Sequence, residues 1–209
     1  MKVLLVDDHI LIRKGIMLLL ENEGFEFCEA QDGPEALAAI SCNCYDIVLL
    51  DISLPGQNGI EVLKLIKRER PNLPVLMLTM YQEEQYAIRA MRAGASGYLE
   101  KNTPPKILVE AMKNICSGGI YLSEKLKNLM AEEVILGHKP HSHRHSELSD
   151  REFQIACQLA SGKTVRKIAD DINLSVSTVS TYRSRLMSKL GIKSNSELTL
   201  YMIKSGFIQ

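Results

Sequence analysis

The chain has 209 residues, of which 45% are hydrophobic and 24% are charged, and its 25 basic side chains balance 25 acidic ones. This length suits one large or two small domains, and the composition is that of an ordinary globular protein. Because no signal peptide and no apolar run of about 20 residues is visible, we expect a cytoplasmic protein without membrane contact. Five scattered cysteines, an odd number, also suit a reducing compartment.

The neutral total hides an uneven distribution of charge. Residues 1–122 contain 12 Lys and Arg against 16 Asp and Glu, residues 123–147 contain 4 against 4, and residues 148–209 contain 9 against 5. An acidic first part and a basic last part suggest two modules with different partners, the second partner being a polyanion.

Strands and helices alternate through residues 1–122. The hydrophobic runs predict strands over 2–6, 25–30, 46–51, 75–79 and 96–100. A helical pattern follows each strand, and Gly or Pro ends most of these helices. Five such units with short connections predict an α/β doubly wound fold with a five-stranded parallel sheet.

The alternation stops between residues 123 and 147, which we predict to be a linker. Residues 125–136 can form a helix, and the segment that follows is polar, is interrupted by Pro140 and contains His138, His141, His143 and His145. A solvated segment would not preorganise four histidines, although a metal-binding or pH-sensing role stays open. Cys42 and Cys44 lack the second pair that a zinc site requires.

Residues 148–209 show the pattern of four short helices. Ser149 and Glu152 are spaced as a capping box, as are Ser194 and Glu197. The two middle helices begin after Thr164 and Ser175, and a three-residue turn at 173–175 separates them. This arrangement predicts an all-α helix-turn-helix domain.

Polar side chains stand at the carboxyl ends of the predicted strands, where open α/β sheets place their ligands. They are Asp7, Asp8, Asp51, Thr79 and Lys101. Carboxylates held this close require a cation, and Mg²⁺ prefers oxygen ligands of this kind. Asp51 is the candidate nucleophile for a phosphoryl group, whose oxygens Lys101 and Thr79 can bind.

These residues closely resemble the receiver domain of two-component response regulators, with Pro55 and Gly59 at the expected spacing after Asp51. The resemblance implies that Asp51 accepts phosphate from a sensor histidine kinase. It implies Mg²⁺ ligands from Asp8, Asp51 and the Ser53 backbone carbonyl, with Asp7 nearby or bound through water. Tyr98 matches the aromatic residue that moves inward when Thr79 contacts the phosphate. One departure is Asn102, because many receivers have proline directly after the lysine.

The third helix of the last module, Val176–Leu190, has two different faces. At 100° per residue, Val179, Tyr182, Leu186 and Leu190 share a core stripe. The opposite face is small and polar, with Ser177, Ser180, Thr181, Ser184 and Ser188, while Arg183, Arg185 and Lys189 lie on its flanks. Such a face fits a DNA major groove about 12 Å wide, with the cations placed to reach phosphates.

This module resembles the LuxR-type helix-turn-helix, on the residues 148–152, Gly162, 168–169, 174–175, 178–179 and 189–191. The whole chain except its linker thus resembles a response regulator of the NarL/FixJ branch. By position, Ser180, Thr181 and Ser184 are the candidates that face bases, and Thr178, Arg183, Arg185 and Lys189 are candidates for phosphate contacts. Tyr182 departs from the common histidine, and Ser180 and Ser184 stand where some members have lysine.

The sequence therefore predicts a regulator of transcription and no enzyme. Phosphate on Asp51 would control dimerisation and binding to double-stranded promoter DNA, and the apolar last helix could pair with its copy or only close the core. Two alternatives stay open. A phosphatase of the haloacid dehalogenase type would need a second Asp where Ser53 stands, and a regulator independent of phosphate would keep the pocket as a relic.

Overall fold

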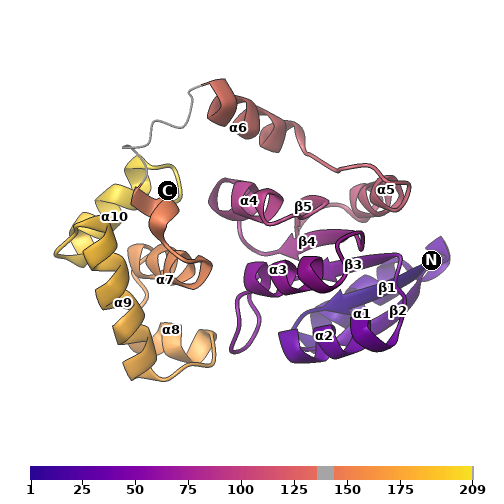
Figure 1. Cartoon of the computed structure of the whole chain (residues 1–209), viewed down its shortest axis with the longest axis horizontal. Coiled ribbons are helices and arrows are strands. Elements are labelled where there is room, and N and C mark those ends of the chain that lie inside the picture. Colours follow the sequence, from indigo (N-terminus) through magenta and orange to yellow (C-terminus); the bar gives the residue numbers. More distant parts are fainter. Residues whose placement is uncertain (136–143, 209) are drawn as a thin grey trace. The chain divides into compact units, whose positions relative to one another are not determined.

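The computed structural model describes residues 1–135 and 144–208 (Figure 1). The chain forms two compact units, Met1–Met130 and Ala131–Gln209. The division falls inside the predicted linker, and the predicted domain limits at 122 and 148 stay predictions. Three of the four linker histidines for which a metal-binding or pH-sensing role was left open, His138, His141 and His143, lie outside the described residues.

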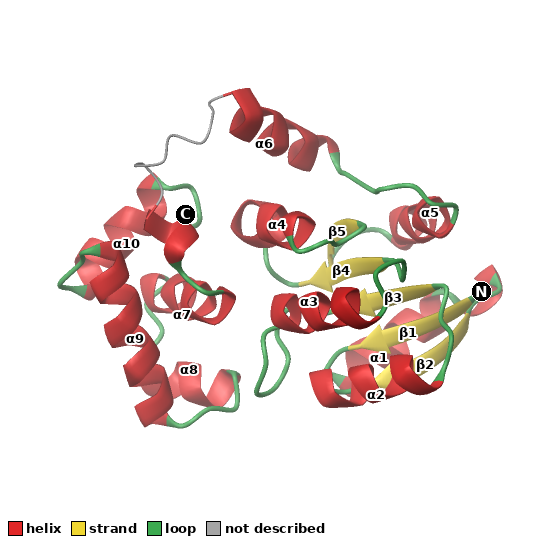
Figure 2. Ribbon diagram, in the orientation of Figure 1, coloured by secondary structure: helices red, strands yellow, loops and turns green. Residues whose placement is uncertain are grey.

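The first unit contains the predicted five-stranded parallel sheet, seen in Figure 2 as yellow arrows. Its strands are β1 (Lys2–Val6), β2 (Glu26–Ala30), β3 (Ile47–Leu50), β4 (Val75–Thr79) and β5 (Gly97–Glu100). They are ordered β2-β1-β3-β4-β5, so the chain reverses direction across the sheet after β2. The carboxyl ends of β1 and β3 are neighbours at that reversal, which is where doubly wound folds bind ligands.

Five helices cover the sheet: α1 (Ile10–Leu19), α2 (Gly33–Cys42), α3 (Gly59–Glu69), α4 (Glu83–Arg92) and α5 (Pro105–Cys116). β1, β3 and β4 are almost fully buried on both faces, as their unbroken hydrophobic runs predict, whereas the edge strand β2 is buried only at Ala30. Side chains of α1 and α5, among them Ile16 and Met112, share one core with Val3 and Leu49 of the sheet. The predicted helices and strands agree with the structure to within about two residues at most ends.

The loop between β3 and α3 is fixed by two neighbouring residues. The side chain of Asn58 accepts a hydrogen bond from the Ile60 backbone N–H, and Glu61 completes a capping box at the start of α3. A Cβ atom on Gly59 would lie 1.9 Å from the backbone oxygen of Asp51. Glycine is therefore required here, because the start of α3 lies directly against the strand end that presents Asp51.

The chain passes from the first unit to the second within α6 (Glu124–Ile135). The second unit then contains η2 (Arg144–Glu147), α7 (Asp150–Ala160), α8 (Val165–Asp171), α9 (Val176–Leu190) and α10 (Asn195–Lys204). Thr164 and Ser175 cap α8 and α9 as predicted, and Ser149 forms the predicted capping box. Asn173, in the turn between α8 and α9, has a φ of 50°, a conformation that asparagine tolerates better than most residues.

The predicted capping box at Ser194 is only half correct. Ser194 accepts the hydrogen bond from the Glu197 backbone N–H, but the Glu197 carboxylate accepts from the backbone N–H of Lys193 rather than from that of Ser194. The two N-cap residues differ in φ, which is −137° at Ser194 and −60° at Ser149, where the capping box is complete.

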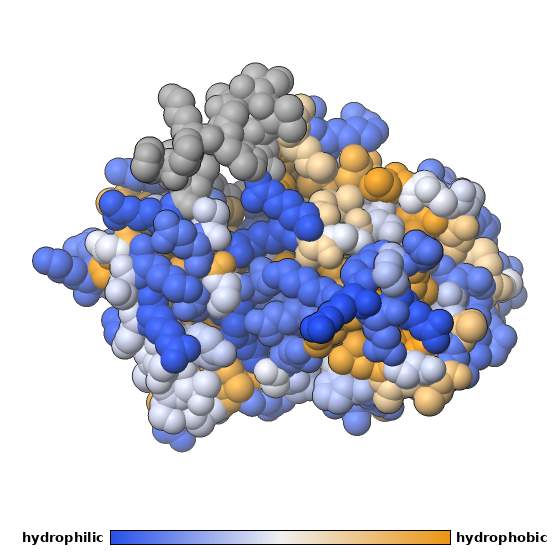
Figure 3. All heavy atoms as spheres, in the orientation of Figure 1, coloured by the Kyte–Doolittle hydropathy of each residue, from blue (hydrophilic) through white to orange (hydrophobic). Residues whose placement is uncertain are grey.

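On the face of the molecule shown in Figure 3, blue hydrophilic residues lie between smaller orange apolar areas. No helix among the described residues has the length and apolar character needed to cross a membrane. All peptide bonds of the described residues are trans, including the one between Lys101 and Asn102 where the sequence departs from the receiver pattern.

Candidate functional site

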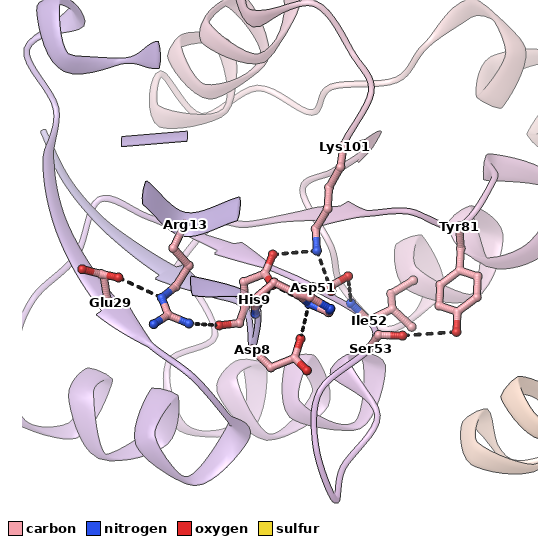
Figure 4. Close-up of polar contacts among 10 residues, drawn as sticks. Asp8, His9, Arg13, Glu29, Asp51, Ile52, Ser53, Tyr81 and Lys101 are labelled. Carbon is pink, nitrogen blue, oxygen red and sulfur yellow. Dashed lines mark hydrogen bonds and ion pairs between the residues drawn. The ribbon is translucent and has the colours of Figure 1, made fainter. Parts of the chain in front are cut away.

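Polar side chains predicted at the carboxyl edge of the sheet come together in a group that we call the Asp51 pocket, and Figure 4 shows three of them, Asp8, Asp51 and Lys101. The Lys101 ammonium lies 2.6 Å from Asp7 Oδ2 and 2.7 Å from Asp51 Oδ2. The three side chains are only 5%, 2% and 3% exposed. A lysine from the loop after β5 thus joins the carboxylates that follow β1 and β3, in surroundings that water hardly screens.

This burial shifts the titration of the pocket. Removal from water raises the pKa of Asp51, although the charge of Lys101 and a hydrogen bond from the Thr79 hydroxyl oppose the shift. Burial favours the neutral amine of Lys101, but the carboxylates of Asp51 and Asp7 outweigh it, so the pKa of Lys101 lies above its usual value. Lys101 is therefore a permanent cation at neutral pH, placed to meet negative charge on Asp51.

Asp8 differs from its neighbour in exposure and in partners. Its side chain is about a third exposed, and Asp8 Oδ1 lies 2.6 Å from Nδ1 of His9. The backbone N–H of His9 donates to Asp7 Oδ1 at 2.9 Å. Ligand atoms of Asp7, Asp8, His9 and Asp51 all lie within 4.8 Å of one another. A set of three carboxylates this close suits a hard divalent cation such as Mg²⁺.

Arg13 is a member of the site that the sequence analysis missed. Its guanidinium donates to the backbone oxygen of Asp7 and, through Nε, to Glu29 Oε2 at 2.8 Å. Arg13 is almost fully buried, and Glu29 belongs to β2, so this contact fixes the acidic loop to the neighbouring strand. The signal was an arginine, followed by Lys14, inside the mostly apolar run 10–19, which a surface position would also explain.

The other side of the pocket is formed by Thr79, Ser53 and two tyrosines. Ser53 Oγ lies 3.2 Å from the Tyr81 hydroxyl, and Tyr98 is fully buried with its hydroxyl donating to the Tyr81 backbone oxygen at 2.9 Å. Burial raises the pKa of Tyr98 well above its usual value, so its hydroxyl stays a donor. The predicted switch residue Tyr98 therefore holds the backbone just before α4.

In the second unit, α9 exposes the predicted small polar face. Val179, Leu186 and Leu190 are buried as predicted, and Met187 joins them. A hollow of about 330 Å³ lies on the helix and is lined by Ser177, Thr178, Thr181, Tyr182 and Arg185. At the amino end of α9 the Ser175 hydroxyl lies 2.7 Å from both the Ser177 and Thr178 hydroxyls. The helix thus presents hydroxyl groups and an exposed arginine on one side.

Two of the predicted phosphate contacts have partners within this unit. Arg183 donates from Nε and Nη2 to Asn195 Oδ1 at 3.1 and 2.9 Å. Lys189 Nζ lies 2.6 Å from Oε2 of the buried Glu152, and the pKa of Glu152 is lowered because the Lys189 contact and the Ser149 bonds outweigh its burial. Both cations therefore also join α9 to its neighbouring helices, a role that the helical pattern alone could not reveal.

The last helix, α10, has one apolar face in the core and apolar side chains on its exposed face. Leu198 and Met202 are fully buried in the core, whereas Leu200 and Ile203 are 53% and 47% exposed. The Tyr201 hydroxyl lies 3.0 Å from Nδ1 of His145, whose ring also packs edge-on against Phe207. Thus His145, predicted to be in a solvated linker, is part of the packed second unit.

Known proteins resemble both units and the whole chain. Residues 3–113 match the model of the response regulator receiver domain, and residues 146–202 match that of the bacterial regulatory proteins of the luxR family. Response regulator UvrY of Escherichia coli is 38% identical over 98% of this chain and 94% of its own length. Response regulator GacA of Pseudomonas aeruginosa is 34% identical over 99% and 97%. The solved complex of the response regulator RcsB with DNA aligns over 97% of each chain, with 26% identity and a TM-score of 0.59.

Proposed function

This chain belongs to the two-component response regulators that have a LuxR-type DNA-binding domain, and we propose that phosphate on Asp51 controls its binding to promoter DNA. The observation that supports this most strongly is the Lys101 ammonium, buried within 2.7 Å of the Asp51 carboxylate. A sensor histidine kinase would supply the phosphoryl group. Since the target is chromosomal DNA, the proposed place of action is the cytoplasm.

In the proposed reaction an Asp51 carboxylate oxygen attacks phosphorus, the bond from phosphorus to the donor nitrogen breaks, and an aspartyl phosphate forms. Lys101 and the Thr79 hydroxyl would bind the phosphoryl oxygens. Asp8, Asp51 and the Ser53 backbone carbonyl would hold Mg²⁺, with Asp7 close by, and the ion would neutralise part of the developing negative charge. The three acidic side chains within 4.8 Å support such a site.

We propose that α9 enters the major groove of double-stranded DNA with its small polar face. Ser180, Thr181 and Ser184 would meet base edges, and Ser177, Thr178 and Arg185 would meet the backbone. Hydroxyl groups can bond to every base, so half-site spacing and DNA shape would supply much of the specificity. Arg183 and Lys189 remain candidates for phosphate contacts, since each is still partly exposed at its surface.

We further propose that the protein binds DNA as a homodimer through α10. Leu200 and Ile203 on its exposed face are about half exposed. Two copies joined there would present two α9 helices to successive half-sites about 10 base pairs apart. A lone module would reach only one half-site.

The phosphoacceptor is tested by incubating the full chain with radiolabelled acetyl phosphate and Mg²⁺. We expect acid-stable, alkali-labile label on the wild type and on Asp46→Asn, which changes an exposed carboxylate just before the same strand. Asp51→Asn should take up none. Label that persists on Asp51→Asn would overturn the assignment. Selection of random DNA fragments by the labelled protein then reports the motif and its half-site spacing, and a single half-site would contradict the dimer.

A further inference from the structure

The segment that follows α5 lies along the edge of the sheet and is held there. The backbone N–H of Tyr121 donates to the Ser96 oxygen at 2.9 Å, and Tyr121 forms a parallel bridge with Gly97 of the edge strand β5. A Cβ atom on Gly97 would lie 3.1 Å from the Tyr121 Cβ, so the absence of a side chain lets the segment approach. The chain therefore leaves α5 along a fixed path.

The first turn of α6 then contacts the first turn of α4. The Ser123 hydroxyl accepts from the Leu126 backbone N–H and donates to Glu83 Oε2 at 2.6 Å. Lys125 Nζ lies 2.6 Å from Glu84 Oε1, and the Leu126 side chain is fully buried. We name Ser123, Lys125 and Leu126 the α6 clasp.

A short series of contacts joins the clasp to the Asp51 pocket. Thr79 ends β4 beside Asp51, and its Oγ1 lies 3.5 Å from the Tyr81 backbone nitrogen. The Tyr98 hydroxyl donates to the Tyr81 backbone oxygen. The residue after Tyr81 is Gln82, the N-cap of α4, which begins at Glu83. Tyr81 therefore lies two residues before Glu83, and Glu83 and Glu84 carry the two carboxylates that the clasp binds.

We propose that the α6 clasp couples the Asp51 pocket to the helix through which the chain continues into the second unit. In the structure described, Thr79 ends β4 beside the Asp51 carboxylate, and its Oγ1 lies 3.5 Å from the Tyr81 backbone nitrogen. A phosphoryl group joined to that carboxylate takes the Thr79 hydroxyl as its own partner, shifts Tyr81 and loosens the clasp. This inference rests on the proposed role of Asp51.

Coupling between two sites is reciprocal, which makes the proposal testable from both sides. If a phosphoryl analogue weakens the clasp by some factor, removal of the clasp must strengthen binding of that analogue by the same factor. Lys125→Ala removes the contact with Glu84. Lys127→Ala is a matched control, because both lysines are 52% exposed and Lys127 pairs only with Glu124 of the same helix among the ion pairs of the described residues.

The experiment uses the full chain with beryllofluoride and Mg²⁺. Hydrogen exchange of the amides 124–130 should accelerate by at least about fivefold when beryllofluoride binds, which is the lower end of typical couplings. Isothermal titration calorimetry should show tighter beryllofluoride binding for Lys125→Ala and for Ser123→Ala, and wild-type affinity for Lys127→Ala. Suppose that beryllofluoride changes hydrogen exchange near Asp51. Unchanged or slower exchange at 124–130, or equal beryllofluoride affinity in the wild type and the three variants, would then overturn the proposed coupling through the clasp. No response at any receiver amide would instead refute the proposed role of Asp51.

Discussion

Replacement of Lys101 by methionine tests how far the buried cation holds the pocket together. Methionine has a similar length, so the packing changes little, while the ammonium at 2.6 Å from Asp7 and 2.7 Å from Asp51 is lost. Removing one partner of a buried ion pair costs about 3–5 kcal/mol, because a buried charge stays behind. Since Asp7 keeps the His9 backbone N–H and Asp51 keeps the Ile52 backbone N–H, we expect the lower end, about 3 kcal/mol near neutral pH.

The cost of this substitution should depend on pH in a defined direction. Burial raises the pKa of Asp51 and Lys101 opposes that shift, so loss of Lys101 raises the pKa of Asp51 further. An acid whose pKa is higher in the folded state binds protons on folding, and its folded form loses stability as pH rises through that pKa. The stability gap between Lys101→Met and the wild type should therefore be small in acid and grow as pH rises towards neutrality.

Hydrogen exchange of the slowest amides of β1 and β3, measured across a pH series, reports the free energy of unfolding of this unit alone. Lys113→Met is the control, because Lys113 forms an exposed pair with Glu23 and such surface pairs contribute about 0–1 kcal/mol. If Lys101→Met lowers the free energy of unfolding by the same amount at every pH, packing is the cause and the electrostatic reasoning is refuted. A loss of stability no greater than that of Lys113→Met would refute it as well.

Further substitutions follow from the local geometry. Gly59→Ala forces a Cβ atom towards the Asp51 oxygen and should cost about 1–3 kcal/mol in thermal unfolding, whereas Gly15→Ala, where a Cβ atom meets nothing, should stabilise α1 by about 0.5–1 kcal/mol. Asn173→Gly should preserve stability in urea unfolding, while Asn173→Val should lose about 1–2 kcal/mol because φ is 50°. Arg185→Ala should weaken DNA binding equally at all sequences and reduce the slope of log affinity against log salt concentration by about 1. A changed base preference would contradict a phosphate contact. Ser123→Ala should raise the pKa of Glu83 beyond the increase that its burial already causes, as followed by carboxyl NMR.

The fold could be predicted from the sequence because local signals and global packing agree. Buried parallel strands appear as unbroken hydrophobic runs, and their ends coincide with glycine, proline or a capping residue. The same logic placed Asp7, Asp51 and Lys101 at one edge, because carboxyl ends of parallel strands must meet there. Backbone topology, which the pattern fixes, was enough to bring these side chains together.

Partners that depend on the packing of distant elements could not be predicted. Arg13 contacts Glu29 across two elements, and Lys189 reaches Glu152 from another helix. Helical periodicity predicts on which face of its helix such a side chain lies, but not which residue of another element it contacts. The helix predicted at 125–136 agrees with α6 to within one residue, but its contacts could not be predicted, because Ser123 and Lys125 bind Glu83 and Glu84 of a distant element.

The charges of the pocket explain why a lysine and a metal ion would both be needed. Asp7, Asp8 and Asp51 bring three negative charges to one strand edge, and Lys101 neutralises one of them. Phosphorylation would replace the single charge of the Asp51 carboxylate by the roughly two charges of a phosphoryl group. Asp7, Asp8 and the phosphoryl group would then carry about four negative charges, and Lys101 would leave an excess of about three within a few ångström, which is unfavourable in a buried site. A divalent cation at Asp8 and Asp51 lowers that excess to about one, so we expect stable phosphorylation of Asp51 to require the ion even where Lys101 is in place.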